Sequence, residues 1–256
     1  MDRVPTRRIV IVGAGLAGAS AAFALRKAGF DGDVTLVGEE DRPPYHRPAL
    51  SKEYLRGEAT PSEILVEPLD EYARRGISLR TGERVVALDP SGHTVELADG
   101  TSLPFDRLLV STGARKRTAD IPGAALDGVF GLRTVEDAEA IAAAATPGSR
   151  AVMVGLGFIG SEVAGSLRQR GTAVTAIGAG RSPLGSVLGD EVGEVIGDIH
   201  RERGVELLAG ESVVAFEGSD RLERVRTSAG RVIACELAVV GIGVEPETGL
   251  LAAAGA

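Results

Sequence analysis

The chain has 256 residues, 44% of them hydrophobic, which is enough for two small globular domains with buried cores. Its 28 basic and 36 acidic side chains give a net charge of −8, which argues against a nucleic-acid-binding body but not against a local basic patch that docks an acidic redox partner. The single cysteine, Cys235, excludes a disulfide framework and a Cys-x-x-Cys pair, and we expect a buried thiol. No apolar run approaches the roughly 18 residues of a membrane span and no secretory signal is visible, so we expect a cytoplasmic protein without a membrane partner.

The same strand–helix–strand pattern occurs twice, about one domain length apart. In each copy a continuous apolar run, typical of a strand buried on both faces of a parallel sheet, ends at a glycine that opens a helix. The first copy comprises a strand at 8–12, a helix at 16–28 and a strand at 33–37. The second comprises a strand at 150–154, a helix at 158–170 and a strand at 172–177. The sequence therefore predicts a duplicated α/β mononucleotide-binding fold.

Shorter elements are predicted around these two copies. An antiparallel set is expected at 83–88, 94–98 and 101–104, with Asp99-Gly100 as a hairpin turn, and another strand at 107–111. Residues 114–131, which contain Pro122-Gly123, form the expected crossover between the domains. A helix at 190–203, a strand at 205–208 and further short strands up to 240, one of them at 232–237, complete the pattern.

The first glycine turn, Gly13-Ala14-Gly15-Leu16-Ala17-Gly18, has the G-x-G-x-x-G spacing between a strand and a helix. Its three glycines permit the tight turn, the approach of a pyrophosphate and close helix–strand packing, and the helix dipole favours the anion. An acidic residue about 20 positions later should hold the adenosine ribose. Glu39 fits that position, with Glu40 as the adjacent alternative.

The second turn, Gly155-Leu156-Gly157-Phe158-Ile159-Gly160, repeats the spacing without its acid. We place the equivalent position at Gly178, three residues before Arg181, which either receives the 2′-phosphate of NADPH or is a solvated loop arginine. Two dinucleotide folds imply two dinucleotides, and a flavin beside a nicotinamide supports hydride transfer. Without a cysteine pair, the electrons must pass to another molecule.

Five segments resemble, in chain order, those of ferredoxin, putidaredoxin and rubredoxin reductases. They are Pro44-Tyr45-His46-Arg47-Pro48-Ala49-Leu50-Ser51-Lys52, Ser111-Thr112-Gly113-Ala114-Arg115 (similar to A-T-G-x-R), 132–138, the Gly155 turn with Glu162, and Gly241-Ile242-Gly243-Val244-Glu245-Pro246. Over essentially its whole length the chain resembles the flavin- and NAD(P)H-binding part of these flavoproteins. The resemblance implies two Rossmann-like, doubly wound domains of the glutathione-reductase type.

The resemblance also implies roles for single residues. The FAD pyrophosphate would be held by Gly13, Gly15, Ala17 and Gly18, and the FAD ribose by Glu39. Val85 would line the adenosine side, Arg47 would lie near the flavin, and Arg133 would contact FAD from the crossover. Lys52 would lie beside the flavin and Glu162 would reach it across the domain boundary, near the position of hydride transfer. Gly155, Gly157, Gly160 and Arg181 are the predicted nicotinamide-nucleotide contacts, Lys52 and Glu162 the predicted catalytic residues, and no metal is expected.

Three features depart from the family pattern. Gly178 stands where members that prefer NADH carry an acid, and His46 occupies a variable position where we expect a solvent-facing imidazole. The chain stops at Ala256, whereas the family returns here to the flavin domain with a Gly-Asp segment and adds a C-terminal domain that covers the flavin. We therefore expect a truncated chain that holds FAD weakly and reduces a ferredoxin poorly.

Taken together, we predict an FAD-binding domain at 1–113 plus 241–256 and an NAD(P)H-binding domain at 114–240. The predicted function is electron transfer from NADH or NADPH through FAD to a ferredoxin-type iron–sulfur protein that serves an oxygenase or a cytochrome P450, in a monomer or weak dimer. One alternative is a dinucleotide-binding module without efficient turnover. Another is a coenzyme A disulfide reductase or NADH oxidase, which needs an active cysteine after the first unit; none occurs between Gly38 and Lys52.

Overall fold

The computed structural model describes residues 7–255, which divide into two compact units. The first unit consists of the described residues up to His46, of Pro61–Arg115 and of the residues from Pro246 on. The second consists of Arg47–Thr60 and Lys116–Glu245. This division differs from the predicted domains mainly at 47–60, which groups with the second unit, and at the return to the first unit, which begins at 246 instead of 241.

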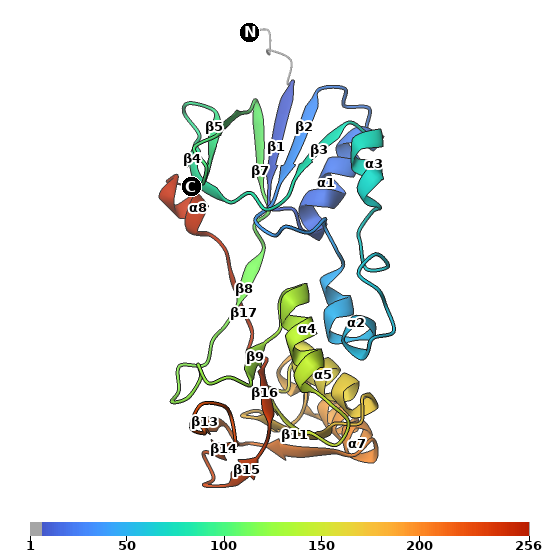
Figure 1. Ribbon diagram of the computed structural model, residues 1–256, viewed down its shortest axis with the longest axis vertical. Coiled ribbons are helices and arrows are strands. Elements are labelled where there is room, and N and C mark those ends of the chain that lie inside the picture. The colour runs from blue at the N-terminus through green and yellow to red at the C-terminus, as the bar shows by residue number, and fades with distance from the viewer. Residues whose placement is uncertain (1–6, 256) are drawn as a thin grey trace. The chain divides into compact units, whose positions relative to one another are not determined.

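A parallel four-stranded sheet forms the centre of the first unit (Figure 1). Its strand order is β3 (Ile77–Arg80), β2 (Asp33–Val37), β1 (Arg8–Val12) and β7 (Arg107–Val110). Helix α1 (Leu16–Lys27) comes after β1, and helix α3 (Leu69–Arg74) precedes β3. Successive strand residues point to opposite faces, so Ile11 packs with α1 on one face while Val10 and Val12 pack on the other.

The second face of this sheet is covered by a small antiparallel sheet of β4 (Val85–Asp89), β5 (Thr94–Leu97) and β6 (Ser102–Pro104). Val95, Leu97 and Phe105 are buried against β1 and β2. Helix α8 (Gly249–Ala253) contacts β4, and Leu250 packs against the same core. The predicted antiparallel set and its turn at Asp99-Gly100 are confirmed.

The second unit is also built on a parallel sheet. Its order is β12 (Val205–Ala209), β11 (Ala173–Gly178), β10 (Arg150–Val154), β16 (Leu237–Val240) and β9 (Val129–Gly131). Its helices are α4 (Val135–Ala144), α5 (Phe158–Gln169), α6 (Gly185–Leu188) and α7 (Asp190–Glu202). Helix α4 begins with a capping box, in which Thr134 accepts from the Asp137 amide and the Asp137 carboxylate accepts from the Thr134 amide. The predicted α/β class and its duplicated strand–helix–strand unit are confirmed.

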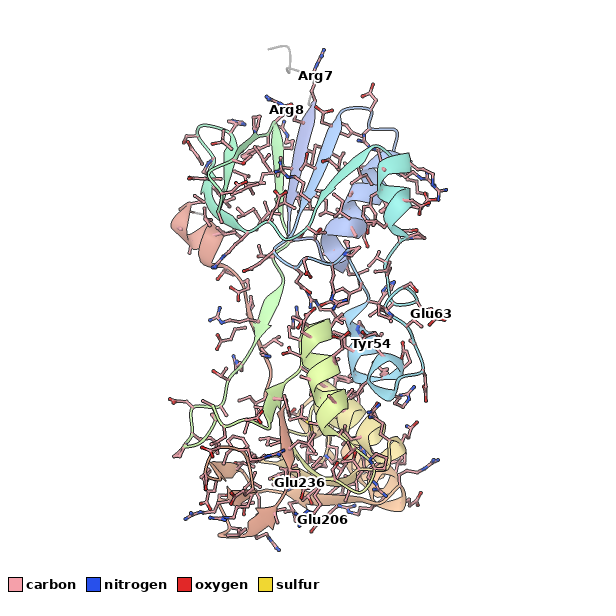
Figure 2. The ribbon with its side chains drawn as sticks, viewed as in Figure 1. Arg7, Arg8, Tyr54, Glu63, Glu206 and Glu236 are labelled. Carbon is pink, nitrogen blue, oxygen red and sulfur yellow. The ribbon has the colours of Figure 1, made fainter. Side chains whose placement is uncertain are left out.

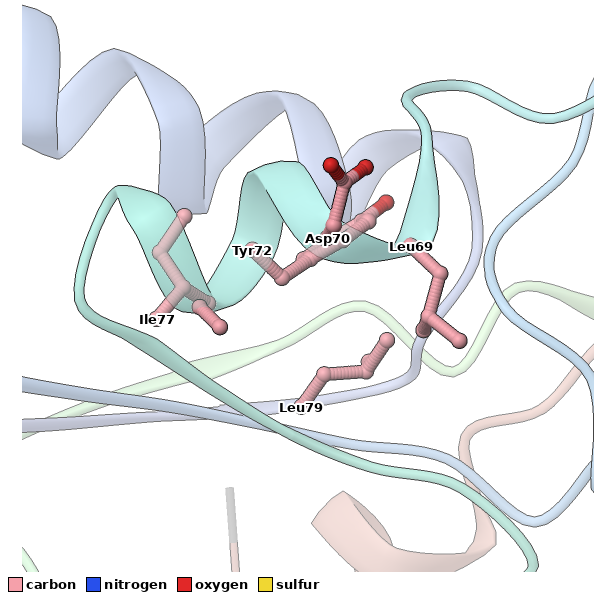
Figure 3. A pocket seen from close by; sticks show the side chains of 6 residues that line it. Leu69, Asp70, Tyr72, Ile77 and Leu79 are labelled. Carbon is pink, nitrogen blue, oxygen red and sulfur yellow. The ribbon is translucent and has the colours of Figure 1, made fainter.

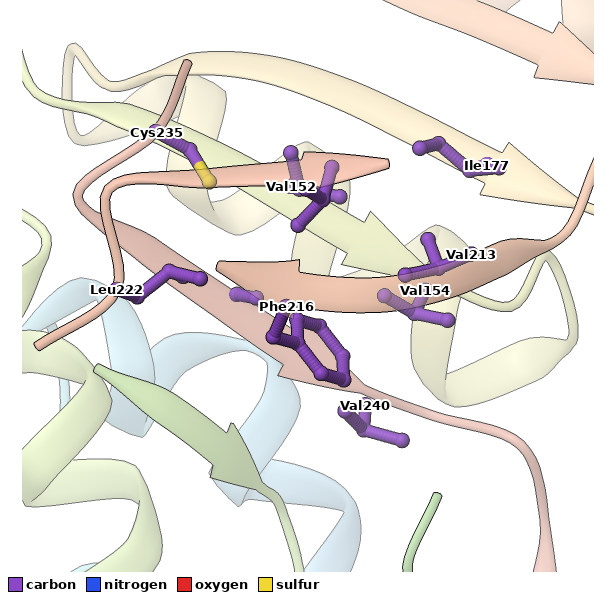
Figure 4. Close-up of a cluster of buried hydrophobic side chains, with 10 residues drawn as sticks. Val152, Val154, Ile177, Val213, Phe216, Leu222, Cys235 and Val240 are labelled. Atoms are coloured by element: carbon purple, nitrogen blue, oxygen red, sulfur yellow. The ribbon is translucent and has the colours of Figure 1, made fainter. Parts of the chain in front are cut away.

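A three-stranded antiparallel sheet of β13 (Val213–Glu217), β14 (Arg224–Thr227) and β15 (Val232–Ala234) closes the second core (Figure 4). Phe216 and Leu222 pack there against Val152 of β10. Cys235 belongs to the same cluster and is 1% exposed, so the predicted buried thiol is confirmed. The single strand predicted at 232–237 is wrong, because the chain leaves β15 at Cys235-Glu236 and then joins the parallel sheet as β16.

Several short elements have no counterpart in the prediction. The segment 47–60 contains the 3-10 helix η1 (Arg47–Ser51) and α2 (Glu53–Arg56), both of which contact α4 and α5. Strands β8 (Ala114–Lys116) and β17 (Val244–Pro246) pair with each other where the chain passes between the units. Elements of three to five residues are too short to show a hydrophobic period. In the described chain no helix is long and apolar enough to cross a membrane.

Candidate functional site

The first glycine turn has the geometry of a phosphate-binding turn. Gly13 has φ +109°, and a Cβ atom added to it would lie 2.2 Å from the backbone oxygen of Ser111. A Cβ at Gly18 would lie 2.1 Å from the backbone oxygen of Gly13. Around a Cβ at Gly15, by contrast, no non-neighbouring atom of the described chain comes within 4 Å. The first and third glycines are therefore required by packing, while the second faces open space.

The second turn reproduces this geometry residue for residue. Gly155 has φ +102°, and its added Cβ would lie 2.4 Å from the backbone oxygen of Gly241. A Cβ at Gly160 would lie 2.0 Å from the oxygen of Gly155. A Cβ at Gly157 would again meet no non-neighbouring described atom within 4 Å. In both turns, close packing requires glycine at the first and third positions. The middle glycine leaves space through which a ligand can approach the backbone.

Each turn leads into a helix whose first N–H groups are left to a ligand. Gly15 is the N-cap residue of α1 and Gly157 that of α5, and neither helix has a side-chain cap among the described residues. Uncapped N–H groups at the positive end of a helix dipole bind anions. An approaching pyrophosphate would find backbone donors and space at Gly15 and at Gly157. The residues present therefore fit a dinucleotide in each turn.

In the first unit, two acidic residues come after β2, and the structure distinguishes between them. The Glu40 carboxylate accepts a hydrogen bond from the Tyr45 hydroxyl, with an O–O distance of 2.5 Å. Glu39 has a side chain that is 71% exposed, with Arg84 3.7 Å away. Glu39 thus keeps its carboxylate available at the end of β2, which supports Glu39 over Glu40 as the predicted ribose ligand.

In the second unit, the position equivalent to Glu39 is Ala179, one residue later than the sequence prediction placed it. The amide of the first glycine in each turn donates to a strand carbonyl, Gly13 to Val37 and Gly155 to Ile177, both at 2.8 Å. Val37 and Ile177 are therefore equivalent, and so are the next residues, Gly38 and Gly178, both of which are buried. The position that sequence spacing assigned to the missing acid, Gly178, is thus equivalent to Gly38. Both units have a buried glycine at this place.

Two further pairs of backbone hydrogen bonds support this equivalence. The bonds from Glu83 to Gly38 (2.9 Å) and from Gly82 to Glu40 (2.8 Å) in the first unit correspond to those from Glu211 to Gly178 (3.2 Å) and from Gly210 to Gly180 (2.9 Å) in the second. The triplet at the end of β2 is Gly-Glu-Glu, and the triplet at the end of β11 is Gly-Ala-Gly. The second unit therefore has no carboxylate at the position that Glu39 occupies in the first.

Lys52 and Glu162, the predicted catalytic pair, lie in contact within the second unit. Lys52 Nζ is 2.8 Å from Glu162 Oε1, and the two side chains are 39% and 30% exposed. Glu162 lies in the first turn and a half of α5, two residues past Gly160. The pair was predicted to bridge the two domains; the structure instead groups the segment that carries Lys52 with α5.

Sequence reasoning did not single out Ser51, which completes this cluster. Its hydroxyl donates to Glu162 Oε2 at 2.6 Å, so both carboxylate oxygens of Glu162 are engaged. The Ser51 carbonyl in turn accepts from the buried hydroxyl of Ser166, at 2.7 Å. The sequence offered one indication of this role, because Ser51 is a polar residue directly before the predicted catalytic lysine.

The remaining contacts of segment 47–60 hold it against α4 and α5. Arg47 donates to the carbonyl oxygen of Arg133 at 2.7 Å, just before α4. Tyr54, labelled in Figure 2, donates through its hydroxyl to Glu139 on α4 at 2.8 Å. Arg170, after α5, donates to the Leu55 carbonyl at 3.0 Å. Arg47 and Arg133, both predicted flavin contacts, thus lie next to each other in the second unit.

The other predicted positions have distinct environments. Val85 is buried in the first core. Ala17 lies in the first turn of α1 and is exposed, next to the open approach at Gly15. His46 is exposed, as predicted. Arg181 is exposed in the loop between β11 and α6.

A surface pocket of about 560 Å³ lies elsewhere in the first unit, between α3 and β3 (Figure 3). Leu69, Tyr72, Ile77 and Leu79 line it, and no residue of the glycine turn does. Tyr72 is 1% exposed, and burial together with the charge of Glu67 raises its pKa to about 12. This largely apolar pocket offers nothing that would hold a pyrophosphate, so we place the candidate site at the glycine turns.

Comparison with known proteins gives concordant matches. The sequence profile of the family described as pyridine nucleotide-disulphide oxidoreductase matches residues 7–256. A probable ferredoxin reductase, CtmF, of Castellaniella defragrans is 43% identical over 97% of this chain and 61% of its own length. Rhodocoxin reductase of Rhodococcus erythropolis is 39% identical over 96% of this chain and 58% of its own. A chain in the crystal structure of the covalent putidaredoxin reductase–putidaredoxin complex matches with a TM-score of 0.94 at 36% identity, covering 97% of this chain and 61% of that one. The chain thus spans about three fifths of the curated relatives' length.

Proposed function

Because the chain belongs to the pyridine nucleotide-disulphide oxidoreductase family, we propose that it is the nucleotide-binding part of an FAD-dependent reductase. In this proposal NAD(P)H gives its electrons to FAD, and a ferredoxin-type iron–sulfur protein receives them. The two curated relatives named above carry reductase names, and the solved structure pairs its reductase with putidaredoxin. The first of these names gives ferredoxin as the acceptor, and we extend it to a small iron–sulfur protein that serves an oxygenase or a cytochrome P450.

The observation that carries the proposal is the pair of glycine turns with matching geometry. One chain with two such turns has places for two dinucleotides, and only the first turn is accompanied by an exposed carboxylate at the ribose position, Glu39. We assign the first turn to FAD and the second to the nicotinamide nucleotide. When bound, the flavin accepts a hydride and can release electrons one at a time, which an iron–sulfur acceptor requires.

The chain's own residues bind and orient the nucleotides in this proposal. The N–H groups at the starts of α1 and α5 hold the two pyrophosphates, and Glu39 accepts from ribose hydroxyls of the FAD. Lys52 and Glu162 are the proposed residues at the position of hydride transfer. Ser51 holds one oxygen of Glu162 while Lys52 holds the other, which fixes the rotamer of the carboxylate.

Disulfide reduction is not supported by this chain. The one cysteine, Cys235, is 1% exposed, and burial raises the pKa of its thiol to about 12. A nucleophilic cysteine needs a lowered pKa and access to solvent. Cys235 is therefore not the electron acceptor in the proposal.

A reconstitution experiment tests the proposal. The purified chain is incubated with FAD, desalted, and its absorbance spectrum recorded; NADH or NADPH is then added without oxygen, and flavin bleaching is followed by stopped flow. Finally a plant-type or dioxygenase-type ferredoxin is added and its reduction recorded. We expect flavin binding and bleaching by NAD(P)H, with the weak FAD retention and the slow ferredoxin reduction that the sequence analysis predicts. A chain that binds both nucleotides without bleaching would be a binding module, and one that retains no FAD would contradict the assignment of the first turn.

A further inference from the structure

We propose that the second dinucleotide fold takes NADPH in preference to NADH, with Arg181 receiving the 2′-phosphate. This inference rests on the proposed function, because it names the nucleotide of the second turn. A dinucleotide fold distinguishes the two nucleotides at the adenosine ribose. A carboxylate there binds the free hydroxyls of NADH and repels a 2′-phosphate, whereas an arginine nearby pairs with that phosphate.

The position of the discriminating carboxylate carries no charge in the second unit. Glu39 occupies it after β2, and Ala179 occupies it after β11. Ala179 is exposed, as Glu39 is, so a longer side chain would have room there. The neighbouring Gly180 also contributes no side chain. Ribose hydroxyls at this place would meet no carboxylate from the triplet at the end of β11.

One residue earlier, Gly178 packs closely against Leu156. A Cβ atom added to Gly178 would lie 2.8 Å from Cγ and Cδ1 of Leu156. Real Cβ atoms do not approach other carbons this closely, so any side chain at 178 requires Leu156 to move. Leu156 is buried in the glycine turn itself. Gly178 therefore packs against Leu156 in this chain and contributes no carboxylate of its own.

The loop that carries Arg181 is attached to the same leucine at both ends. At its start Gly178 lies against the Leu156 side chain, and at its end the Leu184 amide donates to the Leu156 carbonyl at 2.8 Å. Leu184 is buried and has φ +57°, a conformation that is unfavourable for a branched residue and persists only where its surroundings enforce it. Arg181 is three residues from each attachment, so its Cα lies within about 11 Å of both. A long arginine side chain that starts from this loop can therefore reach the ribose end of the second turn.

Two acidic residues next to this loop, Asp190 and Glu211, are hydrogen-bonded within the described chain. Asp190 accepts from the Ser182 hydroxyl at 3.3 Å. Glu211, two residues after β12, accepts from Thr227 at 2.7 Å and from Arg231 at 2.9 Å, and these bonds hold its pKa below the usual range. Within the described chain, no hydrogen bond or ion pair engages the Arg181 side chain, which is exposed. It is thus the cation available for a phosphate.

Isothermal titration of the chain with NADP⁺, NAD⁺, adenosine 2′,5′-bisphosphate and AMP tests the proposal without turnover. We expect NADP⁺ to bind at least about tenfold more tightly than NAD⁺, and the bisphosphate more tightly than AMP by a similar factor. Arg181→Gln should weaken the affinity for NADP⁺ by about tenfold to a hundredfold and leave the affinity for NAD⁺ within about twofold of its original value. Arg181→Lys should restore part of the loss. Arg221→Gln, which removes an equally exposed arginine near the small antiparallel sheet, should change neither affinity.

Ala179→Glu is an independent arm that leaves Arg181 in place. It introduces a carboxylate at the position that Glu39 occupies in the first unit. We expect the affinity for NADP⁺ to fall and that for NAD⁺ to rise, which reverses the preference. Equal or tighter binding of NAD⁺ by the unaltered chain, or an Arg181→Gln chain that keeps its NADP⁺ affinity while folded by circular dichroism, would overturn the inference. If the folded chain binds neither nucleotide nor either adenosine phosphate, the proposed function fails instead, and this outcome is distinct from a wrong preference.

Discussion

The two glycine turns of this chain share a backbone geometry and differ in the side chains beyond it. In both, the first glycine has a φ above +100° and the third glycine packs on the oxygen of the first. Outside the turn, Glu39 after β2 corresponds to Ala179 after β11, and Ser20 on α1 corresponds to Glu162 on α5. The shared part is recognition of a pyrophosphate by backbone, and the differing part selects the rest of each nucleotide by side chains.

The comparison teaches where each kind of specificity resides. A pyrophosphate is bound by N–H groups and a helix dipole, so its recognition depends on the glycine turn between strand and helix and little on the side chains. Riboses and flavin are distinguished by side chains that lie outside the turn. Four measurements test whether backbone and side chains divide recognition in this way. They are given in order of decreasing expected effect.

The largest effect is expected when a methyl group is added at the third glycine of either turn. Gly18→Ala and Gly160→Ala would each bring a Cβ against a backbone oxygen, at 2.1 Å from Gly13 and 2.0 Å from Gly155. Backbone atoms yield little, so we expect the free energy of unfolding to fall by about 3 kcal/mol in each case. Urea denaturation followed by circular dichroism measures it. Equal stability of all variants would mean that the third glycine is not fixed by packing.

The middle glycines should behave in the opposite way. Gly15→Val and Gly157→Val add side chains into space where no described atom lies within 4 Å, at φ values of −99° and −78° that valine adopts. We expect stability within about 0.5 kcal/mol of the unaltered chain and a loss of nucleotide affinity of about a hundredfold, roughly 2.7 kcal/mol.

The two substitutions also separate the nucleotides. Gly15→Val should lower the FAD occupancy measured by absorbance and spare binding of the nicotinamide nucleotide, and Gly157→Val should do the reverse. Gly15→Ala and Gly157→Ala serve as smaller controls. If one variant abolished both nucleotides, the assignment of one nucleotide to each turn would be wrong.

Alkaline pH should destabilise both units through one buried acid in each. Burial raises the pKa of Cys235 in the second unit and of Tyr72 in the first to about 12, from ordinary values of 9.0 and 10.0. Both groups remain neutral when folded and ionise sooner when unfolded, so their stabilising contribution is complete below the unfolded pKa and is lost as pH rises toward 12. From about pH 9 to about pH 10 the cysteine alone should cost on the order of 1 kcal/mol.

Substitution of each group in turn shows how much of the loss of stability at alkaline pH each one causes. Cys235→Ala should flatten the decline in unfolding free energy that begins near the ordinary thiol pKa of 9.0, and Tyr72→Phe the part that begins near the ordinary phenol pKa of 10.0. Guanidinium unfolding at a series of pH values provides the curves. An unchanged slope in Cys235→Ala would show that the thiol does not titrate differently in the folded and unfolded chain.

The smallest effect concerns the pair that only the second unit has. Lys52 and Glu162 are 39% and 30% exposed, so solvent screens their attraction. In a double-mutant cycle of Lys52→Met and Glu162→Gln we expect a coupling energy below about 1 kcal/mol for unfolding. A coupling above about 2 kcal/mol would indicate a structural ion pair and weaken the view that this cluster is retained for hydride transfer. Ser51→Ala with Glu162→Gln is the matched cycle for the neutral contact.

Much of the fold was predictable because its signals are local. The apolar runs at 8–12 and 150–154, each ending at glycine, indicate buried parallel strands without knowledge of their neighbours, and β1 and β10 have these bounds. The antiparallel set after β3 was predicted because strand alternation and a turn at Asp99-Gly100 are both visible in a short window. The buried Cys235 followed from residue type, and the exposed His46 from its variable position in the family pattern.

The two nucleotide turns could be predicted from the amino-acid sequence, because their first and third glycines stand where an added Cβ would lie 2.0–2.4 Å from a backbone oxygen. Only the tertiary structure decided which residues complete each turn. Counting along the chain gave Gly178 as the residue equivalent to Glu39. The backbone hydrogen bonds, which join residues far apart in the chain, show that the equivalent residue is Ala179. The same holds for segment 47–60: side-chain bonds from Ser51, Tyr54 and Arg47 to α5, α4 and the residue before α4 assign it to the second unit. Such contacts join residues far apart in the chain, and no local pattern records them.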